Sequence, residues 1–255
     1  EISACLVGSE MCIRDSFIAR VATQAFTILG AIVVARTLGP SGKGLFSYAG
    51  TVLAMIQMAN AGQAAAIAWQ YTKRNQPPAA VLRGMVRILG ALTIAVALAL
   101  VLTAIFVPGQ TALIAVAVAL PFALFAQSSM GFFLADGHIN MINVQQIIIG
   151  IFAVVIYIPL LIFAHAGLTV LFAVWIAGYI GGAIYSALML RRYAGMREGD
   201  DEINITREQV GYGGTIALNS AVQYLNFRID VFLIMFMLGQ SALGVYSIGI
   251  GSGEL

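Results

Sequence analysis

The chain contains the sequence LGPSGKGLFSYA at residues 38–49 and a second version of it, LGQSALGVYSIG, at residues 238–249. Leu, Gly, Ser, Gly and Ser recur at matching positions, and the two residues after the second Gly are apolar or aromatic in both copies. Each copy follows one apolar segment and opens the next. We therefore interpret the two stretches as an internal repeat that marks equivalent helix junctions.

The composition places the chain among integral membrane proteins. Of its 255 residues, 60% are hydrophobic and 9% are charged, and the mean hydropathy is +0.94. A soluble domain carries about 25% charged residues, enough to cover a surface that faces water. The 27 glycines fit this class as well, because small residues allow membrane helices to approach closely.

Long apolar segments follow one another along the chain. They are longer than the strands of about 10 alternating residues that build membrane β-barrels, so we predict helices. The segments are 17–38, 45–71, 81–107, 110–134, 141–164, 167–190 and 209–237, followed by a shorter one at 242–255.

One polar stretch, RRYAGMREGDDEINITR at 191–207, separates the sixth segment from the seventh. Thr206 and Gln209 match a capping pattern for the start of a helix. We predict an all-α integral membrane fold with a six-helix bundle over 17–190 and a linker over 191–207. The first two helices of a second, pseudo-symmetric bundle follow over 208–255. The last segment is shorter than the about 20 residues of a spanning helix, so we expect the chain to be truncated there.

The first sixteen residues, EISACLVGSEMCIRDS, differ in character from the rest. The part LVGSEMCIRDS resembles the translation of a sequencing adapter, and we interpret 1–16 as an artefact. Both cysteines lie in it, so disulfides, thiolate metal sites and cysteine catalysis are not expected elsewhere. His138 and His165 are isolated, and we expect neither a metal nor a cofactor.

Basic residues predict the orientation in the membrane. Lys73, Arg74, Arg83 and Arg87 cluster after the second segment, and the 191–207 linker contains four arginines, whereas the alternate loops carry few cations. Because Lys and Arg concentrate in cytoplasmic loops, we expect these loops and the N-terminus to be cytoplasmic.

Six predicted helices separate the two copies of the repeat. Since six is even, both copies cross the membrane in the same direction. This indicates a parallel repeat about an axis along the membrane normal, an arrangement found in secondary transporters, which bind substrate between their halves.

Charged residues within the segments are candidates for function, because a charge at the centre of a membrane helix costs about 2.5–3.5 kcal/mol on insertion scales. Arg20 lies early in the first segment and is either a phosphate ligand or an interfacial arginine that extends to the membrane surface. Arg228 and Asp230 lie deep in the seventh segment. They project about 200° apart on a helix, so we expect no direct ion pair between them.

Polar residues at helical spacing form two further candidate sets. We expect both sets to face a cavity and to hydrogen-bond sugar hydroxyls, although hydrogen bonding between helices would explain them equally. The sets are Gln57, Asn60 and Gln63 in the second segment, and Asn219, Gln223 and Asn226 in the seventh, where Asp230 continues the stripe.

Two stretches carry a resemblance to a known family. VARTLGPSGKGLFSYA at 34–49 and FRIDVFLIMFMLGQSALGVYSIG at 227–249 resemble polysaccharide-unit flippases of the multidrug/oligosaccharidyl-lipid/polysaccharide exporter superfamily. The resemblance implies alternating-access transport of undecaprenyl-diphosphate-linked oligosaccharides across the inner membrane. The product would be a surface polysaccharide such as the O-antigen of lipopolysaccharide. The implied partners are the lipid-linked oligosaccharide, membrane lipid and a coupling ion, H⁺ or Na⁺, and no nucleic acid.

Two alternatives remain. A cation-coupled multidrug exporter of the same superfamily would have a cavity centred on a carboxylate, whereas the first segment offers Arg20 and no acidic residue. A membrane glycan polymerase or ligase would need a large outward loop with catalytic groups. The outward loops predicted here are only a few residues long, so we do not expect an enzyme.

Overall fold

The computed structural model describes the backbone of residues 2–74, 77–107, 109–151, 155–156, 159–160, 167–194 and 202–253. Side chains are described for 30–74, 77–107, 109–150, 155–156, 159–160, 167–191 and 207–250. Within these residues the fold is all helical, which confirms the predicted class. The main helices are α1 Ile2–Lys73, α2 Pro78–Phe106, α3 Ala112–Ala135, α4 Ile139–Ile151, α6 Leu168–Ala194, α7 Glu202–Met237 and α8 Gln240–Gly253.

The first two predicted helices form one helical element with a break at the first repeat. Gly39 has φ 70° and ψ 178°, outside the helical region, and Pro40 follows it. Pro lacks the amide hydrogen needed to continue the helical bonding, so the chain changes direction there. The element begins at Ile2 rather than near residue 17, which differs from the prediction.

The boundary between the sixth and seventh helices also differs from the prediction. The helix α6 continues to Ala194 and α7 begins at Glu202, so the interval between them is 195–201 instead of 191–207. Those seven residues lie outside the described part. Thr206 therefore lies one turn inside α7, and its predicted role at the helix start is wrong.

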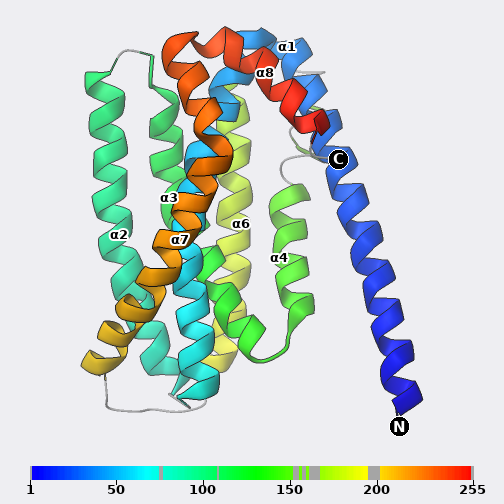
Figure 1. The fold of residues 1–255 in the computed structure, drawn as a ribbon, viewed down its shortest axis with the longest axis vertical. Helices are drawn as coiled ribbons and strands as arrows, with labels where there is room; N and C mark the ends of the chain where they lie inside the picture. The colour runs from blue at the N-terminus through cyan, green and yellow to red at the C-terminus, as the bar shows by residue number, and fades with distance from the viewer. Residues whose placement is uncertain are drawn as a thin grey trace.

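The helices pack as a bundle around the second half of α1. Figure 1 shows α2, α3, α6 and this half of α1 running along the long axis, with α7 crossing the near face and α8 at the upper end. The closest neighbours of α1 are α7, α3 and α8. By length and composition, five helices in the described residues could cross a membrane: Gly30–Lys73, Pro78–Phe106, Ala112–Ala135, Leu168–Arg191 and Arg207–Met237.

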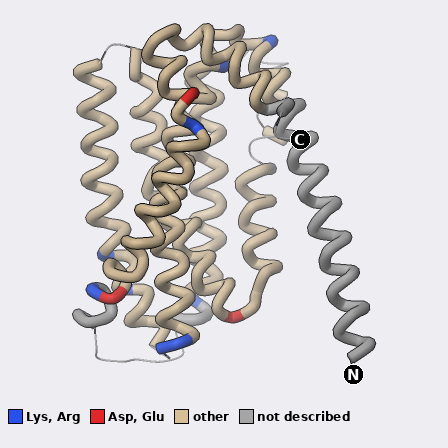
Figure 2. Tube along the Cα trace, in the orientation of Figure 1, with Lys and Arg blue, Asp and Glu red and all other residues tan. Residues whose placement is uncertain are grey.

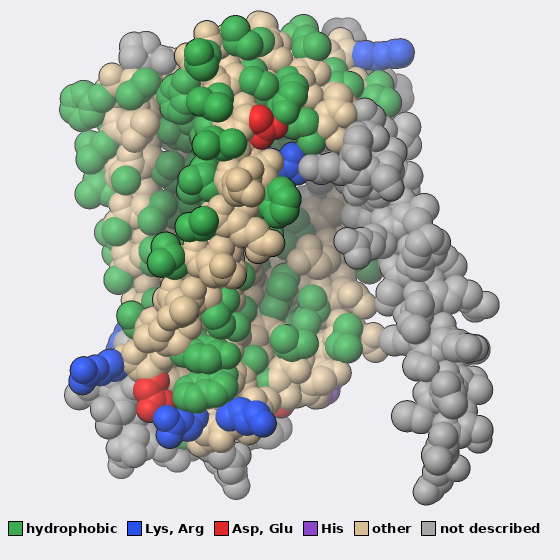
Figure 3. Space-filling view, viewed as in Figure 1, with side chains coloured by type: hydrophobic (Ala, Val, Ile, Leu, Met, Phe, Trp, Pro, Cys, Tyr) green, Lys and Arg blue, Asp and Glu red, His purple; other side chains and the backbone are tan. Residues whose placement is uncertain are grey.

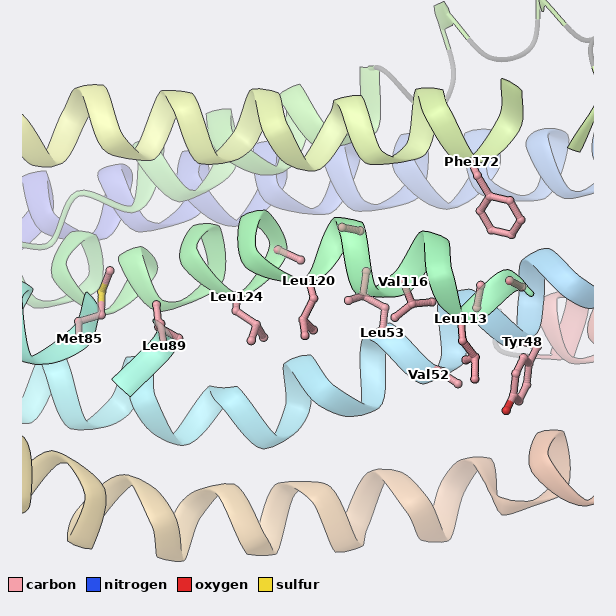
Figure 4. Packing of buried hydrophobic residues seen from close by; sticks show 14 of the residues in the cluster. Tyr48, Val52, Leu53, Met85, Leu89, Leu113, Val116, Leu120, Leu124 and Phe172 are labelled. Carbon is pink, nitrogen blue, oxygen red and sulfur yellow. The ribbon is translucent and has the colours of Figure 1, made fainter. Parts of the chain in front are cut away.

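The largest buried cluster joins α1 and α3 and includes residues of α2, α6, α7 and α8. Figure 4 shows Leu53 of α1 close to Val116 and Leu120 of α3. Leu53 and Leu120 are fully buried. Because α3 is apolar on most of its circumference, it can form the interior of the bundle, and it holds the second half of α1 in place.

Candidate functional site

The two copies of the repeat form equivalent corners in the structure. Gly39 in the break of α1 and Gly239 between α7 and α8 have φ of 70° and 83°. Residues with a side chain rarely adopt such positive φ values, whereas glycine does so readily. The repeated Leu-Gly therefore ends one helical segment and starts the next in both copies, as the sequence predicts.

The two corners pack directly against each other. A Cβ added at Gly44 would overlap the carbonyl oxygen of Gln240, and a Cβ added at Gly244 would overlap that of Pro40. Gly44 and Gly244 are equivalent in the repeat, as are Pro40 and Gln240. When residue i of one copy contacts residue j of the other, and j contacts i, the copies are related by a local two-fold axis. The glycines allow the two backbones to touch at that axis.

The second half of α1 also lies close to α7 along the rest of its length. A Cβ at Gly62 would overlap the carbonyl oxygen of Gly213. One residue further, the amide of Gln63 donates to Oε1 of Gln209 over 3.4 Å, and the Gln209 amide donates to the Val81 carbonyl over 3.3 Å. These contacts join α1, α2 and α7 through buried amides.

A polar and aromatic cluster joins the end of α1 to the start of α7. The Trp69 and Tyr212 rings stack with centroids 5.1 Å apart. Arg74 lies over the Trp69 ring at 5.2 Å and forms an ion pair with Glu208 at 3.3 Å. Figure 2 shows that most described Lys and Arg lie at this end of the bundle. These contacts hold the end of α1 against the start of α7.

The predicted polar set on α1 makes hydrogen bonds between helices. The Asn60 amide donates to the Ser128 hydroxyl over 2.8 Å and to the Leu124 carbonyl over 3.3 Å, both on α3. Gln57 interacts with the hydroxyl of Tyr179 on α6. Together with Gln63, these residues connect α1 to three neighbouring helices. A contact of this set with substrate stays a prediction.

The predicted stripe on α7 has a different environment. Asn219, Gln223 and Asn226 are exposed, while Arg228 and Asp230 are partly exposed. They lie within the candidate span Arg207–Met237, away from the face that packs on α1. On the visible face, Figure 3 shows mostly hydrophobic and uncharged side chains between a basic lower rim and a few charges higher up. Arg20 lies in α1, and its side chain is outside the described residues.

Asp230 has a partner that the sequence reading missed. The hydroxyl of Tyr246 on α8 donates to Oδ2 of Asp230. The other carboxylate oxygen, Oδ1, is buried and has no hydrogen-bond partner among the described residues. Tyr246 occupies the repeat position of Phe46, which instead packs against Phe172 and Trp175 of α6. A comparison of the two repeat copies could have identified this polar replacement.

Comparison with known proteins identifies a family. The family described as polysaccharide biosynthesis protein matches residues 16–250. A search of curated proteins found no match, and neither did a search of solved structures. The match covers most of the chain, including both copies of the repeat, and it agrees with the apolar helices of a multi-pass membrane protein. The chain therefore belongs to the polysaccharide biosynthesis protein family.

Proposed function

We propose that this chain carries lipid-linked oligosaccharide units across a cell's inner membrane for the synthesis of a surface polysaccharide. The family supports a role in polysaccharide biosynthesis, and the apolar helices support transport through a membrane. In the proposed mechanism, segments on either side of the α1–α7–α8 contact tilt relative to each other and open a polar passage to one side at a time.

The main support for this proposal is a set of exposed amide side chains on α7. Asn219, Gln223 and Asn226 lie on one flank of a candidate membrane span, and no interaction of their side chains is found among the described residues. An amide exposed to hydrocarbon without a hydrogen bond costs several kcal/mol. This flank therefore faces water and polar substrate rather than lipid. Amides at this spacing suit sugar hydroxyls, which both donate and accept hydrogen bonds.

The basic residues support the proposed orientation. Lys73, Arg74, Arg83 and Arg87 lie at the end of the bundle where α1 ends and α2 begins. We place this end in the cytoplasm, where Lys and Arg concentrate in membrane proteins. In this orientation the two repeat corners lie on the outer side.

The polar flank can be tested in cells in which this protein provides surface-polysaccharide export. We expect the triple variant Asn219→Ala, Gln223→Ala, Asn226→Ala to lower export about tenfold or more, since each lost hydrogen bond removes roughly 0.5–1.5 kcal/mol. The matched control is Leu218→Ala, Val222→Ala, Leu225→Ala, which changes the apolar side of α7 at the same depth. Equal export by both variants at equal protein levels would contradict the proposal.

The Asp230–Tyr246 pair favours a second candidate, a cation-coupled multidrug exporter. A carboxylate with a buried oxygen and no hydrogen-bond partner for it among the described residues can bind H⁺ or Na⁺ during transport. This candidate predicts that the chain lowers dye accumulation in cells and that Asp230→Asn abolishes the effect. Polysaccharide export without dye efflux would decide for the first candidate.

A further inference from the structure

Lys43 is a buried cation to which the proposed transport mechanism assigns no role. The residue is 8% exposed, and no hydrogen bond or ion pair of Lys43 is found within the described residues. It lies in the candidate span Gly30–Lys73. A buried charge without a partner is strongly unfavourable, and such residues inside membrane proteins mark sites for ions or substrates.

The acidic groups that the structure describes are engaged or located elsewhere. Glu208 pairs with Arg74 at the opposite end of the second half of α1, Asp230 accepts from Tyr246, and Asp136 ends α3. On the α6 side, Leu38 and Phe46 flank Lys43 in sequence and belong to a small apolar cluster with Leu171 and Val174. The described surroundings thus provide no counter-ion.

Two helix N-termini meet beside Lys43. One follows the break at Gly39, and the other is the start of α8, whose Gln240 carbonyl touches Gly44. In α8 the amide of Leu243 bonds back to Gly239, one turn into the helix. The amides before it belong to the first turn, which has no intrahelical acceptors. Each such terminus carries about half a positive charge and binds anions well.

We propose that Lys43 and the two helix N-termini beside it form a binding site for a phosphate-type anion. Lys supplies a full positive charge, and the helix ends supply amide donors and dipoles of the same sign. The repeat copies differ here, since Leu243 occupies the position equivalent to Lys43. Of the two equivalent positions, only one therefore has a cationic side chain. Such an anion occurs both in phospholipid headgroups and in the diphosphate of a lipid-linked saccharide, and only the second source rests on the proposed function.

The chain has two lysines, which provides an internal control. Lys73 is exposed at the far end of α1, whereas Lys43 is buried. In purified full-length chain, brief acetylation followed by mass spectrometry measures the modification rate of each amine separately. We expect 10 mM-range inorganic pyrophosphate to slow acetylation of Lys43 about threefold or more and to leave Lys73 unchanged, as expected for an occupied charge-assisted site.

Vesicles distinguish the two sources of the phosphate group. Protection of Lys43 by phosphatidylglycerol vesicles, but not by phosphatidylcholine vesicles or pyrophosphate, would assign the site to an anionic lipid headgroup. Protection by pyrophosphate would assign it to a diphosphate. Because neither measurement involves transport, failure of the export test would leave these results standing.

Variants test the charge itself. Equilibrium dialysis of pyrophosphate should show about tenfold weaker binding to Lys43→Met and nearly unchanged binding to Lys43→Arg, which keeps the charge. A Lys43 rate that no probe changes would overturn the proposal. An amine that does not react under any condition would also overturn it, because a site open to an anion is open to the small acetylating reagent.

Discussion

At the scale of single residues, glycine decides how closely the helices approach. Gly44, Gly62 and Gly244 each face a backbone carbonyl of another helix, whereas Gly50 has open space around it. The sequence shows all of these positions as glycine within an apolar segment. It could not separate contact positions from free ones, because that difference depends on which helix lies opposite.

The Gly44 contact predicts a large effect of a single methyl group. We expect Gly44→Ala to destabilise the protein by about 1–3 kcal/mol, because the helices must separate to admit the Cβ. Gly50→Ala in the same helix should be neutral or slightly stabilising, since alanine favours helix. Unfolding in detergent, followed by circular dichroism, measures both. Equal losses in the two variants would show that the reciprocal contact is absent.

The backbone at Gly39 predicts a second effect with a different cause. At φ 70° and ψ 178° it occupies a region that is open essentially to glycine alone. Gly39→Ala should therefore destabilise the protein by about 1–3 kcal/mol, although a Cβ there meets no neighbour. The same unfolding measurement applies. A neutral result would mean that the α1 break has another conformation.

The buried Asn60 predicts an energetic coupling between α1 and α3. A double-mutant cycle with Asn60→Ala and Ser128→Ala should give an interaction free energy of about 0.6 kcal/mol, and up to roughly 1.7, the range for hydrogen bonds between membrane helices. Additive losses would place the two side chains out of contact.

At the scale of the elements, the α1–α7 contact combines an ion pair with an aromatic stack. The Arg74 and Glu208 side chains are 53% and 39% exposed, so solvent and salt weaken their attraction. Tyr212 is 43% exposed, but its ring stacks on Trp69, and this contact should contribute more.

This comparison predicts that removing the aromatic stack destabilises the protein more than removing the ion pair. Tyr212→Ala should cost about 0.5–1.5 kcal/mol beyond its lost buried area, whereas Glu208→Gln should cost about 0.2–1 kcal/mol, and less at high salt. Unfolding at two salt concentrations measures both. A larger effect for Glu208→Gln that persists in salt would reverse our account of this contact.

Element boundaries show where the sequence was informative. The repeated Leu-Gly and the gap between the predicted segments 110–134 and 141–164 mark turns in the structure, where Gly39, Gly137 and Gly239 adopt positive φ. The charged residues near 191 and 207 predicted helix ends that differ from those of α6 and α7, since charged side chains also occupy exposed helix surface beyond a membrane. Gln209 was assigned to a helix start, yet it lies buried between α1 and α2. Its role depends on the packing of α7, which local sequence does not contain.

At the scale of the whole molecule, the account rests on two features of the same interface. The repeat copies meet through equivalent residues, and α7 presents its polar flank away from α1. The sequence predicted the repeat from recurring residues and the polar stripe from helical spacing. For Gln57, Asn60 and Gln63 it left hydrogen bonding between helices open as an alternative, but it could not name the three partner helices, because spacing gives a shared face and not the neighbour of that face.

The most direct test is the water exposure of the α7 flank in a membrane. Single cysteines are introduced at 219, 223 and 226, and separately at 218, 222 and 225, in a chain with Cys5 and Cys12 replaced by Ser. A charged thiol reagent that does not cross the bilayer is then supplied to both faces of the membrane. We predict rapid labelling at the first three positions and little at the second three. Similar labelling of both sets, or labelling of the second set alone, would contradict a polar passage along α7.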